Sequence, residues 1–478
     1  MAEVEAENVA LRTENAQLRG ENAALRTEIE QLRRDNQRLL ARVEELERAG
    51  KRQAAPFSRN TPTPNPKRPG RKPGADYGMH ARRAMPERVN RVVDVALPEA
   101  CPHCGGEVAP VRVAYQYQED FPQPQPTDIV RFDVHVGRCR GCGRRIQPRH
   151  REQTSDALGA AGAQLGPRAV ALAAWLSKNL GLPASKIVRL FGYSGLSVTA
   201  GGVTQAVARA GRRAEPTYAA LVTGVRASPV VAPDETGWRV GGAKAWLWAF
   251  VGTTLVVYHI ATGTGARGFD TAATVLGADY PGVLERDGWK PYRSFTRARH
   301  QSCLAHLLRR CRNLTAAADR GAARTPRAVA RILRHALHVR ERRDAGELTA
   351  KQAATEATRI GAAIDTLIAG RTRYPPNRKL LNHLDRERSA LFTFLTIPGV
   401  QATNWRAEHA IRPAVITRKT WGGNRTRAGA TTWQILASVL TTATMQHRDP
   451  VATLIPLLRN PQPAVADLTI PTQPTRGP

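Results

Sequence analysis

The stretch Val230-Val-Ala-Pro-Asp-Glu-Thr-Gly-Trp-Arg-Val240 begins as an apolar run, reaches two acids and then continues with alternating residues. The run predicts a buried β-strand with a carboxylate at its end. Two further segments, 245–251 and 255–260, are rich in aromatic and β-branched residues and predict the next two strands. Residues 245–266 carry no charge and could be mistaken for a membrane span, but Gly252-Thr253-Thr254 between the runs favours a hairpin.

The chain after this three-stranded meander places another acid at a strand end. Residues 265–276 suit a helix, and Val283-Leu-Glu-Arg-Asp287 predicts a fourth strand. If this strand lies beside the first, Asp234 and Asp287 meet at one edge of the sheet, where they could share Mg²⁺. A third ligand is then expected from a later helix.

The candidate for this third ligand lies far along the chain. A basic amphipathic helix is predicted over 301–314, and the Ala- and Arg-rich segment 315–395 is predicted to be a helical insertion. Thr403-Asn-Trp-Arg-Ala-Glu-His-Ala-Ile-Arg-Pro413 then predicts a helix with one acid among basic residues. That acid, Glu408, is the candidate ligand, although an arginine of the same segment could pair with it instead.

Two neighbouring acids are alternatives to the strand-end pair. Glu235 follows Asp234 directly and could be the ligand in its place. Glu285 precedes Asp287 by two residues and shares its strand face, so it could support the site or pair with an arginine. We expect Asp234 rather than Glu235 to be the ligand.

The charge of the chain points to a polyanionic partner. Its 478 residues contain 71 Lys and Arg against 40 Asp and Glu, a formal net charge of +31. Such an excess repels itself unless a polyanion neutralises it, so nucleic acid is the first partner to consider. The acidic, polar start is unlike a secretory signal, and six cysteines are too few for a disulfide scaffold, so a reducing cytoplasm and no membrane partner are expected.

The N-terminal residues follow a seven-residue repeat. Its apolar d positions are Val4, Leu11, Leu18, Leu25, Leu32, Leu39 and Leu46. Four of the a positions hold Asn, and Glu at g precedes Arg at the following e position in four successive heptads. This pattern predicts a parallel, two-stranded coiled coil over residues 1–48, and therefore a homodimer. The alternative is a long solvated helix packed on its own protein.

A cationic, proline-rich segment follows the repeat. Residues 51–74 hold seven Lys or Arg, six Pro and no acid, so they have almost nothing apolar to bury. They predict an extended arm. Arg68, Arg71 and Lys72 are candidate contacts to DNA phosphates in a minor groove, and a solvated spacer is the alternative.

Two CxxC pairs suggest a metal site. Each pair is followed by Gly, which permits the tight turn that two thiolates on one ion require. We predict one structural Zn²⁺ with four thiolate ligands, Cys101, Cys104, Cys139 and Cys142. Alternation over 111–117 and 129–136 predicts two strands between the pairs. Chance or redox-active pairs are the alternative.

Between this ribbon and the first strand, the pattern is helical. Residues 167–180, 184–191 and 199–212 have apolar residues at helical spacing, and Gly192-Tyr-Ser-Gly separates the last two. A helix, a short glycine-containing turn and a helix ending in arginines form a helix-turn-helix pattern, with Arg209 and Arg212 as candidate DNA contacts. Two helices that merely pack together are the alternative.

Several motifs together resemble the IS66 family of insertion-sequence transposases. They are Asp234-Glu-Thr-Gly-Trp-Arg-Val240, Asp287-Gly-Trp289, Cys303-Leu-Ala-His306 with Arg309-Arg310, and Thr403 to Pro413. The repeat, the Arg-Lys-Pro-Gly arm, the cysteine pairs and the block around Arg418-Lys-Thr-Trp421 also fit, so the resemblance covers nearly the whole chain. In that family Tyr is usual at Trp289 and Asn at Trp405.

The resemblance implies a DDE catalytic domain of RNase H-like fold. Its triad corresponds to Asp234, Asp287 and Glu408, which would hold Mg²⁺ or Mn²⁺ for DNA cleavage and strand transfer. Cys303 and His306 would support the site near the DNA end, although packing is the more ordinary role of such a pair. The remaining candidate DNA contacts are the basic residues Arg412, Arg418, Lys419, Arg425 and Arg427.

We therefore expect a multidomain α+β protein. The expected parts are a coiled coil at 1–48, a linker at 49–95, a zinc ribbon at 96–150, a helix-turn-helix-like domain at 155–225, an RNase H-like catalytic domain at 226–445 with an insertion at about 315–395, and a tail at 446–478. The expected function is a transposase acting on element ends and target DNA in the nucleoid, and accessory proteins of the same element are further candidate partners. A DNA-binding repressor derived from a transposase, and a nuclease that does not join strands, are the alternatives.

Overall fold

The structure is a computed structural model that describes residues 2–50, 85–118, 127–157, 164–318, 321–370 and 372–472. These residues belong to two compact units, Met1–Phe121 and Pro122–Pro478, which are described separately. They form 13 α-helices, a two-stranded sheet and a five-stranded sheet, so the protein is of mixed α+β class. Within these ranges, no helix is long and apolar enough to cross a bilayer. The arm residues Arg68, Arg71 and Lys72 lie outside the described residues.

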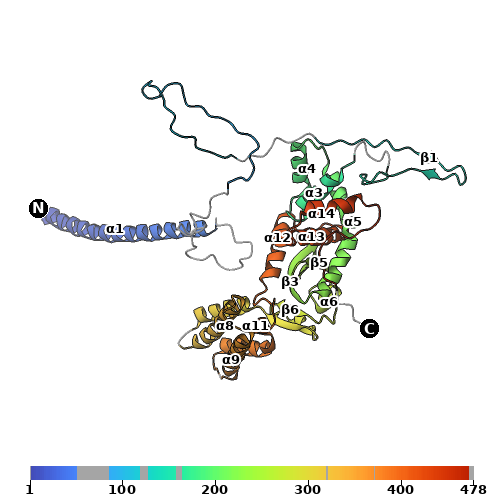
Figure 1. Cartoon of the computed structure of the whole chain (residues 1–478). Helices are drawn as coiled ribbons and strands as arrows, with labels where there is room; N and C mark the ends of the chain where they lie inside the picture. Colours follow the sequence, from blue (N-terminus) through green and yellow to red (C-terminus); the bar gives the residue numbers. More distant parts are fainter. Residues whose placement is uncertain are drawn as a thin grey trace. The chain divides into compact units, whose positions relative to one another are not determined.

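The described residues of the first unit form a long helix and a segment without regular secondary structure. Helix α1 (Ala2–Gly50) is one continuous helix (Figure 1), as the repeat predicts. The leucines at d positions 11, 18, 25, 32 and 39 are exposed, with exposed fractions of 49% to 64%. The strand predicted over 111–117 does not form, and Val111, Val113 and Tyr115 are also exposed. Alternation alone was insufficient there, because a strand needs a hydrogen-bonding neighbour and a surface on which its apolar face can pack.

The five-stranded sheet of the second unit has the order β5-β4-β3-β6-β7. Its strands are β3 (Val230–Val240), β4 (Ala243–Val251), β5 (Val256–Thr262), β6 (Val283–Arg286) and β7 (Arg299–Ser302). The first three are antiparallel neighbours, so the predicted meander is confirmed. Strands β6 and β7 run parallel to β3. Helix α6 (Phe269–Leu276) connects β5 to β6, and the short helix η1 (Lys290–Ser294) precedes β7.

The register of β3 and β6 places two acids at the same level of the sheet. Val230 pairs with Val283, and Asp234 and Asp287 each follow their paired valine by four residues. Because the strands are parallel, both acids lie at the same level of the sheet. The prediction that the fourth strand lies beside the first is therefore confirmed. Asp287 directly follows β6, but β3 continues through Asp234 to Val240 as a partner of β4, so the predicted strand end at Asp234 is wrong.

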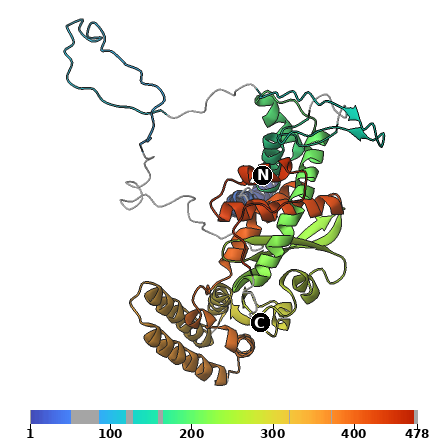
Figure 2. The same ribbon diagram turned by 45° about the vertical axis from the view of Figure 1, so that its right-hand side comes forward.

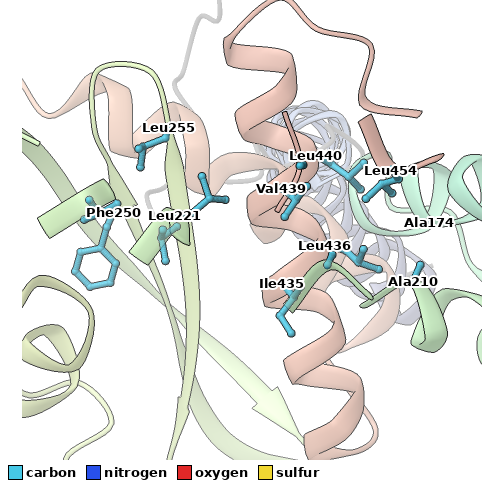
Figure 3. Close-up of a cluster of buried hydrophobic side chains, with 14 of the residues drawn as sticks. Ala174, Ala210, Leu221, Phe250, Leu255, Ile435, Leu436, Val439, Leu440 and Leu454 are labelled. Carbon is cyan, nitrogen blue, oxygen red and sulfur yellow. The ribbon is translucent and has the colours of Figure 1, made fainter. Parts of the chain in front are cut away.

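Both faces of the meander are covered, which explains why its strands are almost continuously apolar. Val231, Trp248 and Phe250 belong to one core, whereas the alternate residues Ala232 and Leu247 belong to another. Helix α13 (Arg427–Met445) contributes to both cores. Figure 3 shows Ile435, Leu436, Val439 and Leu440 of this helix between residues of the sheet side, such as Leu221 and Phe250, and Ala174, Ala210 and Leu454 of neighbouring helices.

The helices expected to form a separate domain share the first of these cores. They are α3 (Pro167–Lys178), α4 (Ala184–Tyr193) and α5 (Ala200–Ala227). Helix α5 is longer than predicted and packs against α13 and β5, so the predicted boundary near residue 226 falls within one hydrophobic core. Helix α14 (Pro450–Arg459), in the segment expected to be a tail, also packs into it through Leu454 and Leu457.

The predicted insertion is helical, and its helices pack in a core that also includes the helix before them and the starts of two strands. Helices α7 (Leu304–Ala317), α8 (Arg324–Asp344), α9 (Ala350–Ala369), α10 (Pro375–Arg386) and α11 (Thr393–Thr396) contribute to it. Val230 and Val283, at the starts of β3 and β6, belong to the same core. Figure 2 shows these helices as a bundle beside the edge of the sheet, from which the chain returns through α12 (Trp405–Trp421) to the meander.

Candidate functional site

Asp234, inside β3, and Asp287, directly after β6, have different local partners. One carboxylate oxygen of Asp234 accepts a hydrogen bond from the backbone N–H of Glu235 at 3.0 Å. Asp287 accepts one from the backbone N–H of Trp289 at 2.8 Å, which closes the turn after β6. Both acids are partly buried. These backbone bonds hold each side chain at the sheet edge and leave other carboxylate oxygens available to a cation.

The third predicted acid, Glu408, lies in the first turn of α12. The start of this helix is tied to β3, because the side-chain amide of Asn404 donates to the carbonyl of Pro233 at 2.9 Å. The peptide N–H of Leu304 donates to the carbonyl of Ala402 at 2.9 Å, which joins the same turn to α7. These bonds hold the start of α12, which carries Glu408, against the part of β3 that carries Asp234.

The pKa of Asp234 reflects the acids around it. Burial, followed by the charges of Glu235, Asp287 and Glu408, raises the pKa of Asp234 to about 7. Asp234 therefore lies in a region of concentrated negative charge. A divalent cation would relieve this repulsion, and carboxylate oxygens are ligands that Mg²⁺ and Mn²⁺ accept. The donor set therefore fits the metal that the sequence predicts.

Glu235, the alternative to Asp234, is held by positive and hydroxyl groups. Its buried carboxylate lies 2.8 Å from a guanidinium nitrogen of Arg267 and accepts a hydrogen bond from the Tyr292 hydroxyl at 2.5 Å. The guanidinium of Arg267 also lies over the rings of Trp246 and Trp289, at 4.4 and 3.8 Å from their centroids. Trp289, which departs from the family's usual Tyr, therefore helps to hold the arginine that neutralises Glu235.

Glu285, the other alternative, is paired within the protein. It is buried and accepts hydrogen bonds from the backbone N–H of Gln401 at 2.5 Å and from the guanidinium of Arg406 at 2.9 Å. The pairing of Glu285 with an arginine is therefore present. Because Arg406 belongs to α12, the contact also ties the helix of Glu408 to strand β6.

A buried ion pair that the sequence analysis missed lies directly behind Asp287. Arg286 donates to the carboxylate of Glu387 at 2.7 Å and to the carbonyl of Asp287 at 3.0 Å. Arg286 and Glu387 are both buried. Arg293 approaches the same carboxylate at 3.0 Å. Glu387 directly follows α10, so the helical insertion supports the turn that carries Asp287. No local motif signals this contact, because its partners lie far apart in the sequence.

Cys303 and His306 lie where α7 begins. Cys303 is the N-cap residue of α7, and its sulfur accepts a hydrogen bond from the backbone N–H of Asn404 at 3.3 Å. The thiol and the carboxylate of Glu408 raise the pKa of His306, with the thiol as the larger influence. Nε2 of His306 lies 3.9 Å from Oε1 of Glu408. The structure thus brings both supporting candidates next to the third acid.

The predicted DNA-contacting residues that are described come from α5, α12 and the segment before α13. Arg209, Arg212, Arg425 and Arg427 are exposed. A cavity of about 430 Å³ is lined by residues of α3, α4, α5 and the start of α13, including Arg212 and Thr426. Of the predicted DNA-contacting residues, Arg212 is the one that lines this cavity.

The basic residues of α12 have other environments. Arg412 and Lys419 are exposed. Arg418 donates to the carbonyl of Gly237 and to the hydroxyl of Thr236, so it helps to hold α12 against β3. Lys178, which the sequence analysis missed, lines the cavity, and burial lowers its pKa to about 8. Its ammonium lies 5.4 Å from the ring centroid of Trp421.

The two cysteine pairs adopt the same local turn. Gly105 donates to the carbonyl of Cys101 at 2.8 Å, and Gly143 donates to that of Cys139 at 2.9 Å. Both glycines have positive φ, +73° and +69°, as the prediction of a tight turn requires. Backbone hydrogen bonds, led by that of His103, lower the pKa of Cys101, and comparable bonds lower that of Cys139. A lowered thiol pKa favours the thiolate, which is the form that binds metals.

The second pair lies between two short strands. Strand β1 (Gly137–Arg138) pairs with β2 (Arg145–Ile146) in an antiparallel hairpin. The strand predicted over 129–136 does not form, and Ile129 and Val130 are exposed there. The hairpin around Cys139 is thus shorter than the alternation of the sequence suggested.

Comparisons with known proteins identify the family of the chain. Residues 162–432, which span α3 to the start of α13 and contain all three acids, match the transposase IS66 family. A protein of Sinorhizobium fredii described as "Uncharacterized protein y4qI" is 28% identical over 235 residues. That similarity covers 44% of this chain and 42% of the relative's length. Because the family match covers more than half of its residues, the chain belongs to the IS66 family of transposases.

Proposed function

We propose that this chain is a DDE transposase that binds the ends of an insertion sequence and catalyses Mg²⁺-dependent DNA cleavage and strand transfer. The observation that carries the proposal is the placement of Asp234, Asp287 and Glu408. Asp234 lies within β3, Asp287 directly follows the neighbouring parallel strand β6, and Glu408 enters from α12. The charges of Asp287 and Glu408 both raise the pKa of Asp234. The sheet order β5-β4-β3-β6-β7, with three antiparallel strands followed by two parallel ones, supports an RNase H-like catalytic domain.

The acids have distinct tasks in this proposal. When bound there, Mg²⁺ or Mn²⁺ would activate the attacking oxygen and stabilise the leaving 3′-oxygen. Asp234, Asp287 and Glu408 hold the cations in place, and the bonds of Asn404 and Arg286 fix the elements that present these acids. Little covalent chemistry is required of the protein, so its contribution is positioning and neutralisation of charge.

The remaining parts bind DNA or hold the assembly together. The exposed arginines of α5 and of the segment before α13 would contact phosphates, together with the arm residues Arg68, Arg71 and Lys72. Residues 1–48 would form a parallel dimer through the exposed leucines of α1, which would bring two chains to one element. The two cysteine turns would share one structural Zn²⁺, since thiolates with lowered pKa values suit that metal.

The decisive experiment separates cleavage from binding. Asp234→Asn, Asp287→Asn and Glu408→Gln each remove one charge and preserve side-chain size. With labelled DNA from the flanks of the coding sequence and a plasmid target, each variant should lose cleavage and joining by orders of magnitude. DNA affinity should be retained or increased, because it rests on contacts between basic residues and phosphates.

The matched control is Asp279→Asn, which changes an exposed acid in the loop before β6. This variant should keep wild-type cleavage. Retained cleavage by Glu408→Gln would show that α12 does not supply the third ligand. Loss of DNA binding together with cleavage in all three variants would favour the repressor, and cleavage without joining in the wild type would favour the nuclease.

A further inference from the structure

Three side chains with different ligand chemistry converge where α7 and α12 begin. The ligand atoms of Cys303, His306 and Glu408 all lie within 4.8 Å of one another. The convergence is fixed by backbone bonds, because Leu304 N–H donates to Ala402 and Asn404 N–H donates to the sulfur of Cys303. The start of one helix thus supplies sulfur and nitrogen, and the start of the other supplies oxygen.

Each of these ligand atoms is available for coordination. The Cys303 thiol is buried, so it is protected from bulk solvent. Nδ1 of His306 is buried, and the thiol of Cys303 is the group that most strongly raises the pKa of this imidazole. Nε2 of His306 lies 3.9 Å from Glu408, beyond hydrogen-bonding distance. Glu408 is partly exposed, which gives an ion a path from solvent.

A thiolate, an imidazole and a carboxylate suit a different metal from the one the acidic triad suits. Zn²⁺ binds sulfur at about 2.3 Å and nitrogen or oxygen at about 2.0–2.2 Å in a tetrahedral arrangement. Mg²⁺ prefers octahedral oxygen ligands and is poorly served by sulfur. Ligand atoms around a tetrahedral Zn²⁺ lie roughly 3.5 Å apart at those bond lengths, so a modest rotation of the side chains would close the site.

We propose that Cys303, His306 and Glu408 bind Zn²⁺ in a site separate from the CxxC pairs, and that this ion withdraws Glu408 from the acidic triad. The second statement rests on the proposed function, because it requires Glu408 to be a ligand of the catalytic metal. Zinc at this site therefore opposes Mg²⁺-dependent cleavage, since one carboxylate is shared by two competing ligand sets.

The binding statement is tested by counting metal on the full chain. Protein equilibrated with Zn²⁺ and freed of excess ion should contain one more zinc per chain than Cys303→Ser or His306→Gln, by elemental analysis. Serine at 303 can still accept the hydrogen bond from Asn404. The matched control is Cys311→Ala, which changes a buried cysteine of the same helix outside the cluster and should keep the wild-type count.

Substitution with Co²⁺ tests the same site by an independent measurement, the absorption spectrum. Co²⁺-substituted wild type should show more thiolate-to-cobalt charge-transfer absorption than Co²⁺-substituted Cys303→Ser. Equal zinc counts and equal cobalt spectra in wild type, Cys303→Ser and His306→Gln would overturn the site. Because His306 is partly exposed, its variant remains informative if the substitution at the buried cysteine impairs folding.

The competition is measured as the ratio of cleavage rates with and without micromolar Zn²⁺ at constant Mg²⁺. The ratio cancels any change in basal rate between proteins. Wild type and Cys311→Ala should be inhibited at least tenfold, and Cys303→Ser should need at least tenfold more Zn²⁺ for the same inhibition. Equal zinc sensitivity would refute the competition. If the wild type shows no cleavage with any of the metals tested, the proposed function fails. The zinc count alone then decides whether the site exists.

Discussion

Replacing Asp234 by Asn should stabilise the metal-free protein while it removes a metal ligand. In the folded protein, burial and neighbouring acids raise the pKa of Asp234 from its ordinary 3.8 to about 7. At pH 8 this side chain is ionised in a place that disfavours the charge. The difference between the two pKa values lowers the free energy of unfolding at this pH by at most roughly 4 kcal/mol, at about 1.36 kcal/mol per pKa unit.

The sign follows from proton linkage. The folded protein binds the proton of Asp234 more tightly than the unfolded chain does, so stability is greatest below pH 3.8 and is lost as the pH rises towards 7. Asparagine does not titrate. The stabilisation by Asp234→Asn should therefore grow from at most roughly 1.5 kcal/mol at pH 5 to at most roughly 4 kcal/mol at pH 8.

The assay is urea unfolding in the presence of a chelator at both pH values. Asp279→Asn should leave the free energy of unfolding unchanged, and Glu235→Gln should lower it, because Arg267 then loses its buried partner. Adding Mg²⁺ should stabilise the wild type more than Asp234→Asn, because only the wild type has the full ligand set. A variant less stable than wild type at pH 8, or a gain independent of pH, would refute the reasoning.

Three other predictions address parts outside the triad. A peptide of residues 1–48 should sediment as a dimer, and a monomeric peptide would contradict the coiled coil. The double substitution Asn15→Leu and Asn22→Leu should raise the thermal stability of this peptide but allow other oligomeric states besides the dimer. Protein purified under reducing conditions should lose one zinc per chain when the cysteines of the CxxC pairs are replaced by Ser, and an unchanged zinc content on elemental analysis would exclude the ribbon. Glu387→Gln should lower the free energy of unfolding by about 3–5 kcal/mol, because it leaves the buried charge of Arg286 unpaired; urea unfolding that matches wild type would show that this pair is unimportant.

The sheet edge could be predicted because its signals are local. Apolar runs that each end at an acid marked β3 and β6, and their adjacency followed from the expectation of a single sheet. Strand β7 was missed because Arg299-His-Gln-Ser302 has no apolar pattern. Its pairing with β6 supplies the hydrogen bonds that hold it in place, and these are not visible in its composition.

Contacts between segments that lie far apart in the chain could not be predicted from the sequence. Helical periodicity predicted α5, but not that this helix would cover the sheet and join its core. The acid Glu387 has no distinguishing neighbours, and its role depends on the meeting of α10 with the turn after β6. Single-sequence patterns specify which face of an element is apolar, whereas the surface that the face covers depends on the whole chain.

The position of α12 and α13 near the end of the chain has a consequence for incomplete products of translation. A polypeptide terminated before residue 405 lacks Glu408 and also lacks α13, whose side chains fill both cores of the meander. Such a fragment can neither assemble the three acids nor bury its sheet. Under the proposed function, only the complete chain therefore cleaves DNA. An incomplete chain stays unfolded and is degraded by proteases.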